Sequence, residues 1–264
     1  MNLPRLNTVI LDIENYTGKI TLNRPEKKNA LNLEMVNDLK TAFDIFENSK
    51  EVRIILLQAM GDVFCSGADL AYLKQLQKFS YKENLKDSES LSGLFLKIYF
   101  CSKPVIAKVA GAALAGGCGL ATVCDFIYAS ENAIFGYPEV RIGFVAALVS
   151  SFLIRQIGER KARDLLLTGR KITAEEAFEI GLINKIISLN EIDSKIEDLI
   201  KKLLKNSPNA LTSTKKIINE FEYTDAKVQS RILSEVNAKF RSTDEFSEGI
   251  NSFLEKRNPN WLIN

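Results

Sequence analysis

The stretch from Lys103 to Asp125, KPVIAKVAGAALAGGCGLATVCD, places the tightest constraint on the fold. It opens with an apolar run at 105–107 that predicts a buried strand. A loop of small residues follows at 110–117, and the pattern then predicts a helix over 118–123. The N–H groups at the start of such a helix stabilise negative charge, and small side chains leave them accessible. Small residues equally suit close packing of a helix on a sheet, so both interpretations stay open at this point.

Strands and helices alternate along the first part of the chain. Apolar runs predict strands at 8–13, 19–22, 52–57, 126–129, 133–135 and 184–187. Helical periodicity predicts helices at 33–47, 71–77, 94–100, 143–157, 159–167 and 174–179. We expect the polar residues 78–92 to form a mobile surface segment. From about residue 190 only helices are predicted, so the pattern indicates an α/β core at 1–190 with parallel strands, followed by a helical region at 191–264.

The composition limits the chemistry that this chain can perform. None of its 264 residues is histidine. This excludes nucleophiles activated by histidine, histidine general bases and the usual zinc sites. Proton transfer must therefore use Asp, Glu, Lys, Tyr or Cys, and we expect no metal.

Charge and cysteine content indicate which classes of partner and which cellular compartment to expect. The net charge of +2 favours neither a nucleic-acid partner nor a membrane surface. No apolar run approaches the ~18 residues of a membrane span, and the N-terminus has no signal-peptide pattern. The four cysteines, Cys65, Cys101, Cys118 and Cys124, lack zinc-type spacing and are expected to be reduced core residues. We therefore expect a cytoplasmic protein.

Four stretches, in order, resemble one known family. They are NRPEKKNALN at 23–32, GDVFCSGADL at 61–70, the run at 103–144 that ends in FGYPEVRIGF, and LLLTGRKITAEEAFEIGLI at 165–183. The chain resembles the enoyl-CoA hydratase/isomerase (crotonase) superfamily. The resemblance implies a spiral of ββα turns and a C-terminal helical region that assembles homotrimers, often stacked as hexamers. It also implies an acyl-CoA thioester substrate, with coenzyme A bound only as part of that substrate.

The resemblance also implies an oxyanion hole. The backbone N–H groups of Ala68 and Gly116 would hold the thioester oxygen, which gains charge as the thioester enolises. Residues that would lie along the coenzyme A and its thioester are Arg24, Lys27, Lys28, Ala30, Ser66, Ala68, Asp69, Leu70, Leu114 and Gly116. Lys27 and Lys28 would meet phosphate groups, or they are simply solvated lysines of a loop.

The expected acid–base groups depart from the family in one place. Hydratases that the chain resembles carry two glutamates. Here the second is present as Glu139, in a short helix that Pro138 begins, but Gly119 stands where the first would be. The helix N-terminus favours the ionised form of Glu139, whereas burial raises its pKa, so this carboxyl group is suited to take and return a proton. Asp125 is expected to cap or pair, and Tyr137 to be a packed aromatic residue.

Several functions remain open on these residues. The leading hypothesis is an enoyl-CoA hydratase that works through an enolate. The absence of the first glutamate also favours a 3-enoyl-CoA to 2-enoyl-CoA isomerase, in which Glu139 alone moves the proton. A thioester-binding paralogue with weak activity is a third reading, and an interaction module that uses the helical tail is a fourth.

Overall fold

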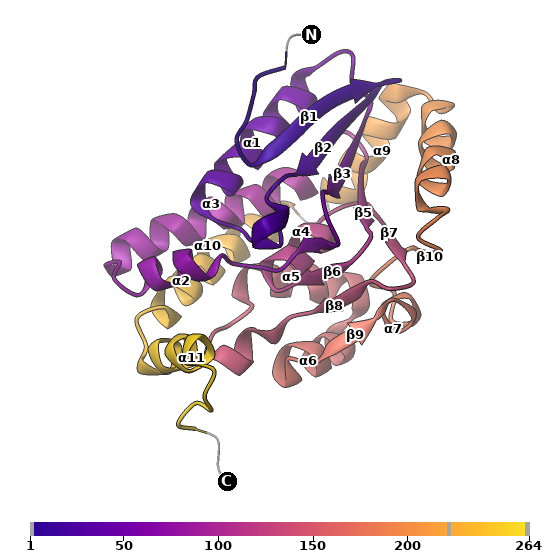
Figure 1. The fold of residues 1–264 in the computed structure, drawn as a ribbon. Coiled ribbons are helices and arrows are strands. Elements are labelled where there is room, and N and C mark those ends of the chain that lie inside the picture. The colour runs from indigo at the N-terminus through magenta and orange to yellow at the C-terminus, as the bar shows by residue number, and fades with distance from the viewer. Residues whose placement is uncertain (1–2, 221–222, 262–264) are drawn as a thin grey trace.

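The computed structural model describes residues 3–220 and 223–261, which form two sheets and the helices around them (Figure 1). The strands are β1 (Val9–Glu14), β2 (Thr17–Leu22), β3 (Ile54–Ala59), β4 (Val63–Cys65), β5 (Val105–Val109), β6 (Ala112–Leu114), β7 (Phe126–Ser130), β8 (Ile134–Gly136), β9 (Lys171–Thr173) and β10 (Lys185–Ile187). The helices are α1 (Leu33–Asn48), α2 (Leu70–Leu76), α3 (Tyr81–Tyr99), α4 (Gly116–Thr122), α5 (Ala147–Ile157), α6 (Glu159–Thr168), α7 (Ala174–Glu179), α8 (Ile192–Leu204), α9 (Pro208–Glu220), α10 (Tyr223–Phe240) and α11 (Asp244–Glu255). Two short 3-10 helices are η1 (Pro25–Lys27) and η2 (Pro138–Ile142).

The strand order confirms the predicted α/β spiral. The larger sheet has the order β1-β2-β3-β5-β7-β10, in which β1 and β2 form an antiparallel hairpin and the remaining pairs are parallel. The smaller sheet has the order β4-β6-β8-β9. The pairs β3–β4, β5–β6 and β7–β8 each give one strand to each sheet before the chain enters a helix. The chain therefore advances as successive ββα turns, as the resemblance implied.

Alternating side chains of β3 connect two hydrophobic layers. Ile55 and Leu57 face the main core, whereas Ile54 and Leu56 face a second cluster that includes Ile196 of α8. Figure 1 shows α8 on the opposite side of this sheet from α2 and α10. The tail after residue 190 is helical where it is described, as expected, while the exact division into two regions at that residue stays a prediction.

The prediction of a mobile segment at 78–92 was wrong, because α3 covers most of it. Ser80 begins this helix with a capping box, in which its side chain accepts from the amide of Glu83 and the Glu83 carboxylate accepts from the Ser80 amide. Asn84 and Ser88 are fully buried. These two buried residues are small and polar, so the inner face of the first half of the helix carries no apolar periodicity that a sequence pattern could detect.

The predicted helix at 143–157 begins later than expected. The 3-10 helix η2 ends at Gly143, which has φ +61°, and α5 starts only at Ala147. Residues 144–146 form a connecting loop. A second difference is β6, which lies inside the stretch expected to be a small-residue loop. Both differences concern segments that line the cavity described below.

The cysteines lie where the sequence predicted them. All four cysteines are free and buried, as predicted. No helix among the described residues is both long and apolar enough to cross a bilayer. Within 3–220 and 223–261, no three side chains of His, Cys, Asp or Glu group together as metal ligands would.

Candidate active site

Two loops that are far apart in the sequence meet at the carboxyl ends of β4 and β6. Gly67 has φ +92°, and a Cβ added to it would lie 2.8 Å from Ala115 Cβ. A Cβ on Gly117 would lie 2.3 Å from the carbonyl oxygen of Cys65. Only glycine tolerates either position without displacing the opposite backbone. These glycines thus bring the start of α4 directly against the loop at 66–69.

The loop at 66–69 presents the amide of Ala68. Leu31 forms a parallel bridge with Ala68, in which the Leu31 N–H bonds Gly67 O at 2.7 Å and the Asp69 N–H bonds Leu31 O at 2.8 Å. In a parallel bridge the residue between these two bonds directs its own N–H and C=O away from the partner strand. Within the described part of the chain, no acceptor bonds the Ala68 N–H.

Gly116 presents the second amide, at the first position of α4. The N–H groups of a helix's first turn have no carbonyl behind them to bond, so this one is available to a ligand. The preceding residue, Ala115, has φ +51° and ψ −129°, and its N–H bonds Gly136 O at 2.8 Å. A non-glycine residue in this region stores about 1–3 kcal/mol of strain. The fold therefore holds an unfavourable backbone conformation immediately before the exposed amide.

An ion pair holds the Ala68 loop in place. Arg24 Nη2 lies 2.9 Å from Asp69 Oδ2, and Arg24 Nη1 donates to Ala30 O at 2.6 Å. Asp69 also begins α2, because its Oδ1 accepts from the amides of Ala71 and Tyr72. Burial alone would raise the pKa of Asp69, but these hydrogen bonds hold it below its usual value. Arg24 and Asp69 thus balance each other's charge, and the pair fixes the position of the chain at the start of α2.

Glu139 is the buried carboxyl group of the site. It is 7% exposed, and its Oε2 has no hydrogen-bond partner among the described residues. Its position follows from η2, which Pro138 begins, and from the Phe144 N–H, which bonds Glu139 O at 3.0 Å. Burial raises the pKa of Glu139 to about 7, against an ordinary value of 4.5. A carboxyl group in this state exchanges a proton readily near neutral pH.

The other two residues that the sequence analysis weighed, Tyr137 and Asp125, have partners within the protein. Tyr137 is fully buried, and its hydroxyl group shares a hydrogen bond of 2.6 Å with Thr122 Oγ1. The expectation that Tyr137 is a packed aromatic residue is therefore confirmed. Asp125 pairs with Lys215 at 2.5 Å and accepts from the Val105 amide at 2.7 Å, as its expected capping or pairing role requires.

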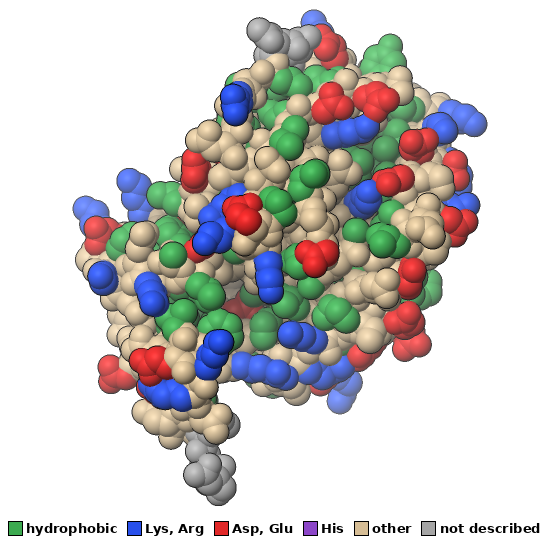
Figure 2. Space-filling view, viewed as in Figure 1, with side chains coloured by type: hydrophobic (Ala, Val, Ile, Leu, Met, Phe, Trp, Pro, Cys, Tyr) green, Lys and Arg blue, Asp and Glu red, His purple; other side chains and the backbone are tan. Residues whose placement is uncertain are grey.

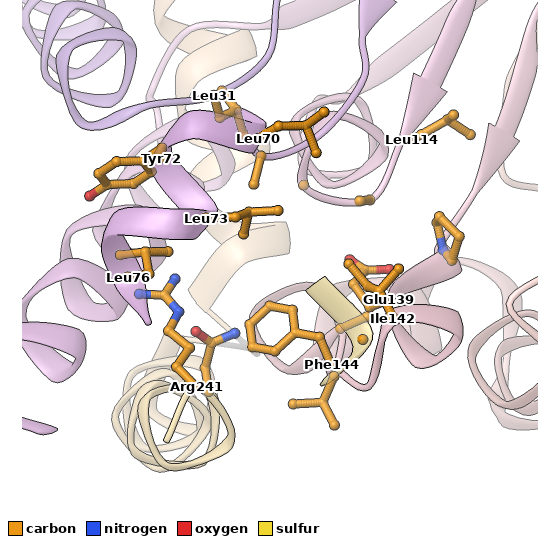
Figure 3. Close-up of a pocket in the computed structure, with 18 of the residues that line it drawn as sticks. Leu31, Leu70, Tyr72, Leu73, Leu76, Leu114, Glu139, Ile142, Phe144 and Arg241 are labelled. Atoms are coloured by element: carbon orange, nitrogen blue, oxygen red, sulfur yellow. The ribbon is translucent and has the colours of Figure 1, made fainter. Parts of the chain in front are cut away.

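A cavity of about 490 Å³ joins Ala68, Gly116 and Glu139. Most of its lining is apolar, and Figure 3 shows leucines from α2 above it, with Phe144 and Ile142 below. Other lining residues that the sequence predicted are Ser66, Leu70 and Leu114. Ala68 and Leu70 are exposed, whereas Glu139 is buried, so the cavity leads from the surface to the carboxyl group.

Gly119 does not line this cavity. A Cβ on Gly119 would lie 2.3 Å from Val149 Cγ1 and 3.1 Å from Phe95 Cζ. Val149 of α5 and Phe95 of α3 therefore fill the space where a side chain would project. Among the residues that the structure describes, Glu139 and Asp87 are the carboxyl groups that line the cavity, and Asp87 is paired with Arg241.

Five residues expected along the coenzyme A lie outside the lining, and several lining residues were not expected. Arg24, Lys27, Lys28, Ala30 and Asp69 are not among the lining residues; Lys27 and Lys28 are exposed on the adjacent η1 loop. Sequence reasoning missed the basic lining residues Arg141, Lys171, Arg241 and Arg257. Figure 2 shows Lys and Arg side chains gathered on the lower part of the face, over the region of α6, β9 and α11. Arg141 lies two residues after Glu139 within the matched segment, and this closeness in sequence was the one available signal.

The fold and this cavity define a class of protein. It is an α/β protein whose spiral of ββα turns encloses a largely apolar cavity, with a buried acid and two backbone amides for which the described residues provide no acceptor. Such an arrangement suits a substrate that carries a carbonyl group next to a carbon atom that gains or loses a proton.

Comparison with known proteins identifies the family. Residues 12–263 match the family model described as enoyl-CoA hydratase/isomerase. The chain is 41% identical over 244 residues to a protein of Thermus thermophilus named "Putative enoyl-CoA hydratase", covering 92% of this chain and 96% of that one. It is 34% identical over 254 residues to the "Short-chain-enoyl-CoA hydratase" of Clostridium acetobutylicum, covering 96% of each. A crystal structure of an enoyl-CoA hydratase from Mycobacterium avium superposes with a TM-score of 0.87 at 30% identity, covering 97% of this chain and 99% of that one.

The chain belongs to the enoyl-CoA hydratase/isomerase family. It also has the fold of the crotonase superfamily, as the sequence motifs predicted.

Proposed function

We propose that this protein hydrates enoyl-CoA thioesters and that Glu139 carries the proton. The observation that supports this most directly is the buried Glu139 carboxyl group, whose Oε2 has no protein partner in the described chain and which lies in an apolar cavity. The names of the relatives, which are enoyl-CoA hydratases, support the same reaction.

The proposed reaction adds water across the double bond conjugated to the thioester. The oxygen of water bonds to C3, and the electron pair of the double bond moves toward the thioester oxygen. The amides of Ala68 and Gly116 stabilise the charge on that oxygen, and in other enzymes the loss of one such donor costs about 2.7–4 kcal/mol. A proton then bonds to C2. Because burial places the pKa of Glu139 at about 7, this group can both accept a proton from water and return one to carbon.

A second candidate is isomerisation of a 3-enoyl to a 2-enoyl thioester. In this reaction Glu139 removes a proton from C2, the double bond shifts through an enolate, and the same proton bonds to C4. The packing of Val149 and Phe95 against Gly119 favours this candidate, because a hydratase with two glutamates would need room for a side chain there. One carboxyl group and two amides are sufficient for this proton transfer.

The coenzyme A portion would lie outside the cavity, against the basic side chains near its opening. Arg141, Lys171 and Arg257 line the cavity and are exposed, and Lys27 and Lys28 lie on the η1 loop. Phosphate groups pair favourably with such side chains. The proposed reactions require no cofactor, since side-chain and backbone groups transfer the proton and stabilise the charge.

The proposed assembly is a homotrimer or a hexamer of two trimers, in the cytoplasm. On α10, Val228, Ile232 and Val236 recur every fourth residue and are 56%, 54% and 39% exposed. An apolar stripe of this kind on a helix is typical of a surface that another chain covers. The molar mass in solution, measured by light scattering, tests this proposal.

One assay separates the two candidate reactions. Crotonyl-CoA loses its enoyl absorbance if the protein is a hydratase, and a 3-enoyl-CoA gains that absorbance if it is an isomerase. A protein that only binds thioesters changes neither, although acetoacetyl-CoA would still raise its melting temperature. The Glu139→Gln variant is the control, because it preserves the size of the side chain. The proposal would be wrong if neither substrate were converted, or if this variant were fully active.

A further inference from the structure

The wall of the cavity away from Glu139 carries a buried arginine. Arg241 directly follows α10, and its side chain is 5% exposed. Arg241 Nη1 lies 2.6 Å from Asp87 Oδ2, while the Tyr72 hydroxyl donates to Asp87 Oδ1. Figure 3 shows Arg241 beside Leu76 and Tyr72, on the other side of Phe144 from Glu139. An acyl chain that fills the cavity beyond the reacting carbons would therefore approach Arg241.

Part of this arginine has no partner. Arg241 Nε is buried, and no described residue accepts a hydrogen bond from it. Arg241 Cζ lies over the Phe144 ring, 5.9 Å from the ring centre, and Leu73 and Leu76 also line the cavity. A buried N–H without an acceptor is unfavourable, and a charged donor more so. A wall of the largely apolar cavity thus carries a charged side chain whose Nε has no acceptor among the described residues.

A second donor lies one helical turn away. Asn237 also lines the cavity, and its Oδ1 accepts from Ser88 Oγ at 2.8 Å. Within the described chain nothing accepts from its Nδ2. Residues four apart on a helix share a face, so Asn237 and Arg241 direct their donors to the same side of α10. Two donors on one wall match the two oxygen atoms of a carboxylate.

We propose that this wall selects enoyl thioesters whose acyl chain ends in a carboxylate, which Arg241 and Asn237 bind. This inference rests on the proposed function and specifies its substrate class. Asp87 and Tyr72 hold the guanidinium in place, and Arg241 and Asn237 both line the cavity. A terminal methyl group would instead leave the Arg241 N–H without an acceptor, so the apolar analogue is disfavoured.

Matched substrates test the proposal without any mutation. Glutaconyl-CoA and 5-methyl-2-hexenoyl-CoA have the same shape, because two methyl groups of the second replace the carboxylate oxygens of the first. A pair that is one carbon longer, hex-2-enedioyl-CoA and 6-methyl-2-heptenoyl-CoA, covers the case in which Arg241 lies farther from the reacting carbons. We expect kcat/KM to favour the carboxylate in at least one pair by roughly 10-fold or more, as a charge-assisted hydrogen bond predicts. Equal values in both pairs would overturn the proposal.

Two variants with opposite expected effects separate recognition from a structural role. Arg241→Met should raise KM for the carboxylated substrate by roughly 10-fold and change KM for its apolar isostere less than threefold. Asp87→Asn removes the carboxylate that competes for the guanidinium, so it should lower KM for the carboxylated substrate. If both variants reduce turnover of both substrates equally, Arg241 only holds α3 and α10 together, and the proposal is wrong.

The binding of saturated thioesters tests the carboxylate site independently of the proposed hydration. Glutaryl-CoA and its apolar isostere 5-methylhexanoyl-CoA cannot be hydrated, and calorimetry gives the Kd of each for the wild-type protein. Tighter binding of glutaryl-CoA supports the carboxylate site even if crotonyl-CoA is not converted, in which case only the proposed reaction fails. Equal Kd values, together with active hydration of crotonyl-CoA, would retain the reaction and reject the carboxylate site.

Discussion

Val149 packs on the position where Gly119 would carry a side chain. A Cβ on Gly119 would lie 2.3 Å from Val149 Cγ1, and Phe95 closes the other side at 3.1 Å. The first glutamate that hydratases of this family carry is therefore not simply missing from this chain. Aromatic and aliphatic side chains from α3 and α5 occupy its space, so a second carboxyl group at that position would displace them.

This packing predicts that Gly119→Glu fails to add a working acid. From the sequence alone, this substitution should raise hydration if the loop is otherwise hydratase-like. The structure leads us to expect the opposite, because overpacking costs about 1–3 kcal/mol and a buried carboxylate adds to that. We expect a lower melting temperature and no gain in crotonyl-CoA hydration. The double variant Gly119→Glu with Val149→Ala should recover part of the stability, and Gly119→Ala serves as the control. Increased hydration by the single variant would contradict the packing described here.

Glu139→Gln should remove turnover while leaving thioester binding nearly unchanged. The amide matches the carboxyl group in size but cannot exchange the proton, and general acid–base groups typically contribute about 10²- to 10⁴-fold to rate. The expected result is a fall of this order in kcat, with the Kd of acetoacetyl-CoA within about threefold of wild type. Calorimetry provides the Kd, and the enoyl absorbance provides kcat. An unchanged kcat would remove Glu139 from the mechanism.

The same residue predicts how stability depends on pH. Between pH 4.5 and about 7 the folded protein retains a proton on Glu139 that the unfolded chain has already lost. The free energy of unfolding therefore falls as the pH rises through this range. At 1.36 kcal/mol for each pH unit, the expected loss relative to Glu139→Gln is roughly 3 kcal/mol. Urea unfolding of both proteins at several pH values measures it, and parallel curves would show that burial does not shift this pKa.

The Arg24–Asp69 pair predicts a catalytic effect from residues outside the cavity. Asp69→Ala removes both the cap of α2 and the partner of Arg24, and losing such a cap costs about 0.5–2 kcal/mol. Asp69→Asn keeps an oxygen for the cap but loses the ion pair. Since both interactions hold the Ala68 amide in place, we expect kcat to fall in both variants and to fall further in Asp69→Ala. Similar kcat values for the wild type, Asp69→Ala and Asp69→Asn would mean that the Ala68 loop keeps its position without this ion pair.

The ion pair of Lys215 and Asp125 predicts how the helical tail is attached. Lys215 of α9 is 8% exposed and donates to both Asp125 Oδ2 and Lys103 O. Removing one partner of a fully buried pair typically destabilises a protein by about 3–5 kcal/mol, but the Asp125 side chain is 27% exposed, so water reduces this cost. Lys215→Met should therefore lower the free energy of unfolding by less than that amount, measured by urea unfolding. The double variant with Asp125→Asn should be less destabilised than the single one.

Local patterns account for the parts of the structure that the sequence predicted. The strands and the short helix at Pro138 follow from apolar runs and turn residues. The matched motifs contain Ala68, Gly116 and Glu139, and all three line one cavity. The failures depend on tertiary contacts. The burial of Ser88 on α3 follows from its contact with α10, and the filled space at Gly119 follows from Val149. Arg241 lies far along the chain from every matched motif, so no local signal marked it.

The close contact between Gly67 and Ala115 has a consequence for how such a protein diversifies. Gly67 faces the Ala115 Cβ and the Leu114 carbonyl oxygen, so main-chain atoms and the Cβ of one small residue set the separation of the Ala68 and Gly116 amides. The walls of the cavity come from other parts of the chain, namely α2, α3, the 144–146 loop and the end of α10. Natural variation can therefore remodel these walls while the two loops keep their contact.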